Sequence, residues 1–150
     1  MGQFWRAYEP GTFFMSNGLS GMGFGIPAAI AAQLVSPDKP VLAVVGDGGM
    51  LMMLHDLALI RELKLPVIVV VLSDGSLSLI RLSAERRGFS PYGVDFQPPD
   101  FRTIAEAFGI AGKRVSDIAG LRDSIDQALS DRRATLIDVP IDYREYGLLV

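Results

Sequence analysis

Two aspartates, Asp47 and Asp74, are the residues of this 150-residue chain that are best placed to do chemistry. Each one ends an apolar run rich in valine, and a segment of helical length separates the two runs. A strand that is buried on both faces reads as a continuous apolar run. Two such strands joined by a helix form a βαβ unit, whose parallel strands end at the same edge of the sheet. We therefore expect both carboxylates at the carboxyl edge, where open α/β sheets bind their ligands.

The glycines around Asp47 indicate an anionic ligand that is held through a cation. Gly46, Gly48 and Gly49 allow the backbone to approach a ligand closely, and the segment after them would point N-terminal amides at the same place. Carboxylates repel an anion unless a hard cation lies between them, and Mg²⁺ bridging aspartate and phosphate oxygens meets that requirement. The alternative for both aspartates is a turn, because Asp-Gly pairs are typical of turns.

The elements that must position these residues alternate between helices and strands. We expect helices at residues 24–35, 51–63, 76–86 and 101–108 and from Ser116 or Asp117 to Leu129. The buried strands are expected at residues 41–46, 65–72 and 134–139, with a surface loop at 88–99. This order predicts an α/β fold, a three-layer sandwich in which helices flank a mainly parallel sheet.

Composition restricts the classes of function. Fourteen Lys and Arg against seventeen Asp and Glu give a net charge of −3, which argues against a nucleic-acid or membrane-surface partner. Without cysteine, neither a disulfide framework nor a thiolate metal site is possible. The longest apolar run is too short to span a bilayer, and MGQFWRAYEP lacks the apolar region of a signal peptide. We therefore expect a single cytoplasmic domain over residues 1–150.

Several motifs in fixed order resemble the thiamine diphosphate enzymes. In that family a Gly-Asp-Gly is followed, after a spacer, by a pair that is usually Asn-Asn; here Gly46-Asp47-Gly48 is followed by Ser73-Asp74. The resemblance extends through SNGLSGMGFGIPAAIAAQ (16–33), VDFQPPDFRTIAEAFGIAG (94–112) and LIDVPIDY (136–143). It is to the C-terminal, diphosphate-binding domain of the acetolactate synthase and pyruvate decarboxylase-like enzymes. Ser-Asp departs from the usual pair, although an Asn-Asp form resembles the catabolic acetolactate synthases.

The resemblance implies roles for individual residues. The side chains of Asp47 and Asp74 and the carbonyl of Ser76 would bind Mg²⁺. The Ser20 carbonyl would accept a hydrogen bond from the aminopyrimidine amine, and Met22 would hold the two cofactor rings in a bent V, unless it is a plain core residue. The full cofactor-binding set implied is Ser20, Gly21, Met22, Gly46, Asp47, Gly48, Gly49, Asp74, Ser76 and Leu77.

The glutamate that activates the cofactor in this family belongs to a separate pyrimidine-binding domain, and nothing in this chain matches it. The resemblance thus implies no catalytic residue here, but an excised C-terminal domain or one subunit of a two-chain enzyme, with self-association expected. The tail at 141–150 resembles the end of the full-length chains. The implied reaction is decarboxylation of a 2-oxo acid followed by ligation to a second carbonyl, without a flavin.

Other readings stay open beside this one. The chain could be a module that binds Mg²⁺-diphosphate without catalysis, or a decarboxylase or lyase subunit of a two-chain enzyme. A dinucleotide-binding domain is disfavoured because Leu51 stands where its fingerprint needs a third glycine. His55, the only histidine, is expected to be a surface or packing residue. Arg81, Arg86 and Arg87 could meet an acidic substrate or be solvated.

Overall fold

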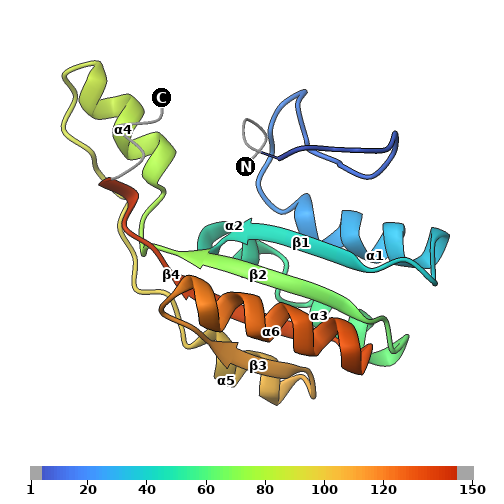
Figure 1. Ribbon diagram of the computed structural model, residues 1–150. Coiled ribbons are helices and arrows are strands. Elements are labelled where there is room, and N and C mark those ends of the chain that lie inside the picture. The colour runs from blue at the N-terminus through green and yellow to red at the C-terminus, as the bar shows by residue number, and fades with distance from the viewer. Residues whose placement is uncertain (1–4, 145–150) are drawn as a thin grey trace.

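The computed structural model describes residues 5–144 of the chain. The centre of the fold is a four-stranded parallel sheet (Figure 1). The strands are β1 (Val41–Gly46), β2 (Val67–Ser73), β3 (Ala111–Arg114) and β4 (Thr135–Pro140), and they lie in the order β1-β2-β4-β3. Every neighbouring pair is parallel. Residues 1–4 and 145–150 lie outside the described residues, and so does most of the tail that resembles the end of full-length chains.

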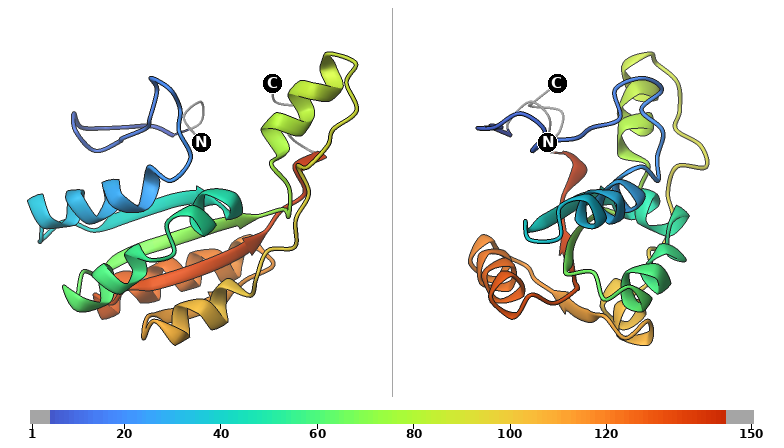
Figure 2. Two further views of the ribbon diagram at one scale, coloured as in Figure 1. Left: turned by 180° about the vertical axis from the view of Figure 1, so that it is seen from behind. Right: turned by 90° about the vertical axis from the view of Figure 1, so that its right-hand side faces the viewer.

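Helices cover both faces of this sheet and make the predicted three layers (Figure 2). The helices of residues 5–144 are α1 (Gly25–Val35), α2 (Asp47–Met52), α3 (Asp56–Glu62), α4 (Ser78–Arg86), α5 (Phe101–Ala107) and α6 (Ile118–Asp131), and all except α4 contribute to the layers over the sheet. Alternate residues of β2 point to opposite faces. Val67, Val69 and Val71 join a core cluster with residues of α1, α2, α3 and α5, whereas Ile68 and Val70 join a second cluster with α6. Both faces of β2 are therefore buried, which explains why its sequence is a continuous apolar run. The parallel sheet with helices on both faces confirms the predicted α/β fold.

The predicted starts of two helices, α5 and α6, are confirmed by side chains that cap them. Asp100 accepts a hydrogen bond from the Thr103 N–H at 3.1 Å at the start of α5. At the start of α6, Asp117 rather than Ser116 is the N-cap, and it accepts from the Gly120 N–H at 2.7 Å. These bonds satisfy amides that have no partner within the helix.

The crossover between β1 and β2 differs from the prediction. We predicted one helix over 51–63, but the chain forms α2 and α3 with a turn between them. The N–H groups of Met53, Asp56 and Leu57 bond to carbonyls three residues back, the pattern of a tighter turn that interrupts an α-helix. Helix α2 also starts earlier than predicted, at Asp47. It includes two glycines of low helix propensity, and the complete burial of Met50 anchors it in the core.

Strand β3 was not predicted at all. Its sequence, AGKR, contains no β-branched or aromatic residue, and it lies at the edge of the sheet beside β4. A Cβ on Gly112 would lie 2.3 Å from the carbonyl oxygen of Arg102, so α5 packs directly against the backbone of this strand. The extended conformation of β3 is therefore determined by its contacts with β4 and α5, not by its own residues.

Helix α4 and the loop after it project beyond the carboxyl end of the sheet (Figure 1). The helix begins at Ser78, two residues later than predicted. The predicted loop at 88–99 holds no helix or strand, but Asp95 forms an isolated antiparallel bridge with Ser76. Within residues 5–144, no helix has both the length and the apolar character needed to cross a membrane.

Candidate functional site

Asp47 and Asp74 meet at the carboxyl edge of the sheet, as predicted. Parallel pairing aligns Gly46 with Leu72, so β1 and β2 end side by side. Asp47 is 3% exposed, and its Oδ2 accepts hydrogen bonds from the N–H groups of Asp74 at 3.1 Å and Gly75 at 2.8 Å. Its Oδ1 accepts from the Gly48 N–H at 2.8 Å. Asp47 therefore connects the start of α2 to the loop after β2. Because Asp47 and Gly48 are the first residues of this helix, the turn that we kept as an alternative for Asp47 is wrong.

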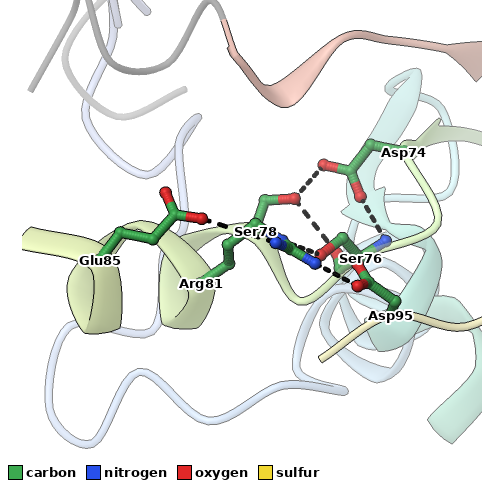
Figure 3. A network of polar contacts seen from close by, with 6 residues as sticks. All are labelled: Asp74, Ser76, Ser78, Arg81, Glu85 and Asp95. Carbon is green, nitrogen blue, oxygen red and sulfur yellow. Dashed lines mark hydrogen bonds and ion pairs between the residues drawn. The ribbon is translucent and has the colours of Figure 1, made fainter. Parts of the chain in front are cut away.

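Asp74 is held through both of its carboxylate oxygens (Figure 3). Oδ1 accepts from the Ser76 N–H at 3.0 Å, and Oδ2 accepts from the Ser78 hydroxyl at 2.6 Å. The next residue, Gly75, has a φ of +70°, a conformation that L side chains rarely adopt. The predicted Asp-Gly turn thus describes the backbone of residues 74 and 75, and the backbone N–H of Asp74 lies against the Asp47 carboxylate.

The backbone around Ser76 fixes the direction of its carbonyl. The Gly75 carbonyl accepts from the Phe96 N–H at 3.0 Å, and the Leu77 N–H donates to the Val94 carbonyl at 2.8 Å. In such an antiparallel pairing the residue between the bonded ones points its own N–H and C=O away from the partner strand. Accordingly, the Ser76 N–H bonds to Asp74 and its carbonyl oxygen lies 3.4 Å from the Ser78 Oγ.

These oxygens fit a small hard cation. Two carboxylates and one carbonyl are the ligands that Mg²⁺ prefers, and Mg²⁺ usually completes its octahedron with phosphate oxygens and water. Within the part of the chain that the structure describes, no three His, Cys, Asp or Glu side chains gather as a metal-binding group. A cation here would therefore need ligands beyond the carboxylates of the chain, such as phosphate oxygens or water.

Met22 and Leu77, both predicted site residues, come together over Gly48. A Cβ added to Gly48 would lie 2.8 Å from the Met22 Cε and 3.0 Å from the Leu77 Cδ2. Met22 is 45% exposed and belongs to neither core cluster, so the plain core reading is wrong. These two side chains form an apolar surface next to the carboxylates.

The remaining predicted residues are Gly49, Gly46, Gly21 and Ser20. A Cβ on Gly49 would lie 3.8 Å from the backbone nitrogen of Gly23, which brings the segment after Met22 against the start of α2. Gly46 and Gly21 have no other atom within 4 Å of the place of a Cβ, so both leave open space. Ser20 lies on exposed backbone at a φ of +50°.

Arg81 links the Ser76 loop to the loop after α4 (Figure 3). Its Nε donates to the Ser76 Oγ at 3.2 Å, and its other nitrogens form ion pairs with Asp95 and, at 3.5 Å, with Glu85. The guanidinium carbon also lies 5.5 Å from the centroid of the Tyr143 ring. The hydrogen bond from Arg81 lowers the pKa of Asp95, and Asp95 in turn raises the pKa of Arg81. Arg81 is thus engaged within the protein, not simply solvated.

The sequence did not reveal the parts played by Ser78, Arg81 and Asp95. The spacing of Ser78 four residues after Asp74 was the only available signal, since Asp95 lies on a distant loop. Arg87 lies exposed just beyond α4, and its contact with a substrate stays a prediction. His55 is on the surface as expected, 3.4 Å from the Asp56 carboxylate, but it lies in the turn before α3.

Comparison with known proteins agrees with this geometry. Residues 1–139 match the family model described as "Thiamine pyrophosphate enzyme, C-terminal TPP binding domain". The acetolactate synthase of Bacillus subtilis is 34% identical over 145 residues, which cover 97% of this chain and 25% of that protein. The acetolactate synthase large subunit of Lactococcus lactis is 36% identical over 138 residues, covering 89% of this chain and 23% of that protein.

A solved structure shows the same fold. The thiamine diphosphate-dependent 4-hydroxybenzoylformate decarboxylase of Rhodococcus jostii RHA1 superposes with a TM-score of 0.77 at 31% identity, over 83% of this chain and 24% of that one. The chain therefore spans about a quarter of the length of the relatives that it matches.

Proposed function

The chain belongs to the thiamine pyrophosphate enzyme family, of which it matches the C-terminal TPP-binding domain, and we propose that it binds thiamine diphosphate through Mg²⁺ held by Asp47, Asp74 and the Ser76 carbonyl. The observation that carries the proposal is the hydrogen bonding that links these residues at the carboxyl edge of the sheet, from the Asp74 N–H to Asp47 and from the Ser76 N–H to Asp74. The family resemblance predicted from the sequence motifs is confirmed.

The remaining residues of the site would hold the other parts of the cofactor. Gly46, Gly48 and Gly49 would face the diphosphate, where small residues and backbone amides favour an anion. Met22 and Leu77 would pack against the rings, and the Ser20 carbonyl and Gly21 would meet the aminopyrimidine. When bound, thiamine diphosphate supplies the electron sink for decarboxylation of a 2-oxo acid.

We propose that a pyrimidine-binding domain or subunit completes the site and supplies the activating glutamate. Apolar side chains near the site support this, since Met22, Phe24, Leu79 and Ile80 are each at least 44% exposed. Exposed apolar surface of this kind marks an interface. In the same way we expect the chain to self-associate. Its predicted cytoplasmic location stays a prediction.

The two kinds of relative suggest two reactions for the completed enzyme. The similarity to acetolactate synthases favours decarboxylation of a 2-oxo acid followed by ligation to a second carbonyl. The similarity to a 4-hydroxybenzoylformate decarboxylase favours decarboxylation that ends with release of an aldehyde. Products formed from pyruvate and from an aromatic 2-oxo acid by the completed enzyme would distinguish them.

Calorimetric titration with thiamine diphosphate, once with Mg²⁺ and once with EDTA, tests the binding proposal. We expect saturable heat only with Mg²⁺, and its loss in Asp74→Ala. The matched control is Asp126→Ala, which removes an exposed carboxylate from α6 and should bind like wild type. Equal heat in EDTA would contradict the metal bridge. Tighter binding of NAD or ATP, which also carry diphosphates, would instead favour a nucleotide-binding domain.

A further inference from the structure

The Ser78 hydroxyl lies against two of the three oxygens that the proposed function assigns to Mg²⁺. Its Oγ is 2.6 Å from the Asp74 Oδ2 and 3.4 Å from the Ser76 carbonyl oxygen (Figure 3). The residue is 8% exposed, so water has little access to this group. Neither the motif of the family nor the sequence reading gave Ser78 a role.

Ser78 does not perform the usual task of a serine at a helix start. An N-cap serine accepts a hydrogen bond from a backbone N–H of the first turn. In α4 the N-cap is Leu77 and no side chain caps the helix, while Ser78 is the first helical residue. Its hydroxyl instead donates backwards, to the carboxylate four residues earlier. The position of this hydroxyl is therefore explained by Asp74 and not by helix capping.

We propose that Ser78 is a positioning residue of the metal site, whose hydroxyl holds the Asp74 carboxylate in place beside the Ser76 carbonyl before the cation arrives. This inference rests on the proposed function. Asp74 receives one donor on each oxygen, the Ser76 N–H on Oδ1 and the Ser78 hydroxyl on Oδ2. A carboxylate oxygen has two acceptor positions, so each keeps one for a cation. Fixing a ligand in advance removes the entropy cost of ordering it when the metal binds.

Hydrogen exchange of the Ser76 amide tests the positioning without any ligand. In wild type this amide donates to a carboxylate that Ser78 holds in place. We expect faster exchange of the Ser76 amide in Ser78→Ala, and near wild-type exchange in Ser78→Thr, which keeps the hydroxyl. The matched control is Ser83→Ala, an exposed serine on the same helix, which should leave the amide unchanged. Unchanged exchange in Ser78→Ala would overturn the proposal.

If Ser78 positions a metal ligand in advance, its loss should weaken Mg²⁺ binding. The Mg²⁺ concentration needed for half-maximal binding of thiamine diphosphate measures this effect. Loss of a group that orients a metal ligand weakens metal binding about 10- to 100-fold, and we expect Ser78→Ala to raise this concentration by roughly tenfold or more. An unchanged concentration would overturn the proposal, and a lower one would show that the hydroxyl competes with the cation. If wild type shows no Mg²⁺-dependent binding, the proposed function fails, and the exchange of the Ser76 amide alone decides whether Ser78 positions this loop.

Discussion

Truncation of Asp47 should destabilise the folded chain even in the absence of metal and cofactor. The Asp47 carboxylate is almost fully buried and accepts hydrogen bonds from the N–H groups of Gly48, Asp74 and Gly75. Asp47→Ala removes the acceptor of all three, and two of them belong to the loop that carries the other proposed metal ligands. The substitution therefore breaks a connection between α2 and the end of β2.

The size of the effect follows from these bonds. A hydrogen bond to a charged group contributes about 1.5–3 kcal/mol, and an unsatisfied buried donor costs about 1–3 kcal/mol. Because the three amides are only half-buried, water can reach them after truncation, and we expect a total loss on the order of 3 kcal/mol. For a chain of this size that corresponds to a fall in Tm of roughly 6–12 °C.

Two further variants make a graded series. Asp47→Asn keeps one oxygen that can still accept from Asp74 and Gly75, so we expect a loss of about 1–2 kcal/mol. Asp74→Ala removes the acceptor of the Ser76 N–H and of the Ser78 hydroxyl, and we expect a loss of about 1–2 kcal/mol.

The assay is urea unfolding followed by circular dichroism in EDTA, so that no bound metal contributes. Asp126→Ala serves as the control and should lie within about 0.5 kcal/mol of wild type. A loss below about 1 kcal/mol in Asp47→Ala would refute the reasoning, and so would an Asn variant as unstable as the Ala variant. The expected order also explains why Asp74, not Asp47, is the better residue to remove in binding experiments.

Two other predictions concern the sheet edge and the loop after α4. Gly112→Ala would place a Cβ 2.3 Å from the Arg102 carbonyl oxygen, so α5 must move away from β3. We expect the free energy of unfolding, measured in urea, to fall by about 1–3 kcal/mol. A change within experimental error would show that this contact is not tight. Because Arg81 lowers the pKa of Asp95 in the folded state, the ion pair should stabilise the protein above the ordinary carboxyl pKa of 3.8 and lose its effect as the pH falls below it. The stability difference between wild type and Asp95→Asn should accordingly be larger at pH 7 than at pH 3, and a difference independent of pH would contradict the assignment.

The parts of the fold that the sequence predicted are those set by local pattern. The valine-rich run of β2 is buried on both faces and could not be mistaken for a surface strand. Asp100 and Asp117 cap helices by bonds to residues three positions ahead, so the sequence predicted the first cap and limited the second to Ser116 or Asp117. The edge strand β3 was missed because its four residues owe their conformation to β4 and α5, which lie elsewhere in the chain.

In the site, too, the sequence predicted what local pattern and topology determine and missed what contacts between distant residues determine. Gly-Asp-Gly at the end of β1 and Asp74 at the end of β2 follow from the βαβ topology, and the structure brings them together. What the sequence could not supply were contacts between distant loops, such as the pairing of residues 94–96 with 75–77. The sequence also could not supply the contact that Ser73 makes with a neighbouring strand. This serine replaces the first Asn of the usual pair, and its hydroxyl bonds to the buried Asp138 on β4, which Arg114 neutralises at 2.9 Å.

The two halves of the proposed site are held by different forces. Hydrogen bonds fix the half that would bind Mg²⁺, where Asp47, Asp74 and the Ser76 backbone are tied to one another and to residues 94–96. The half that would bind the rings consists of Met22 and Leu77 packed over Gly48, with Met22 still 45% exposed. Directional bonds set the positions of oxygens within narrow limits, whereas an exposed apolar side chain keeps rotamer freedom until something packs against it. In the proposed function, the chain therefore provides a formed metal-binding loop by itself, and the ring pocket takes its final shape only with the cofactor and the partner domain in place.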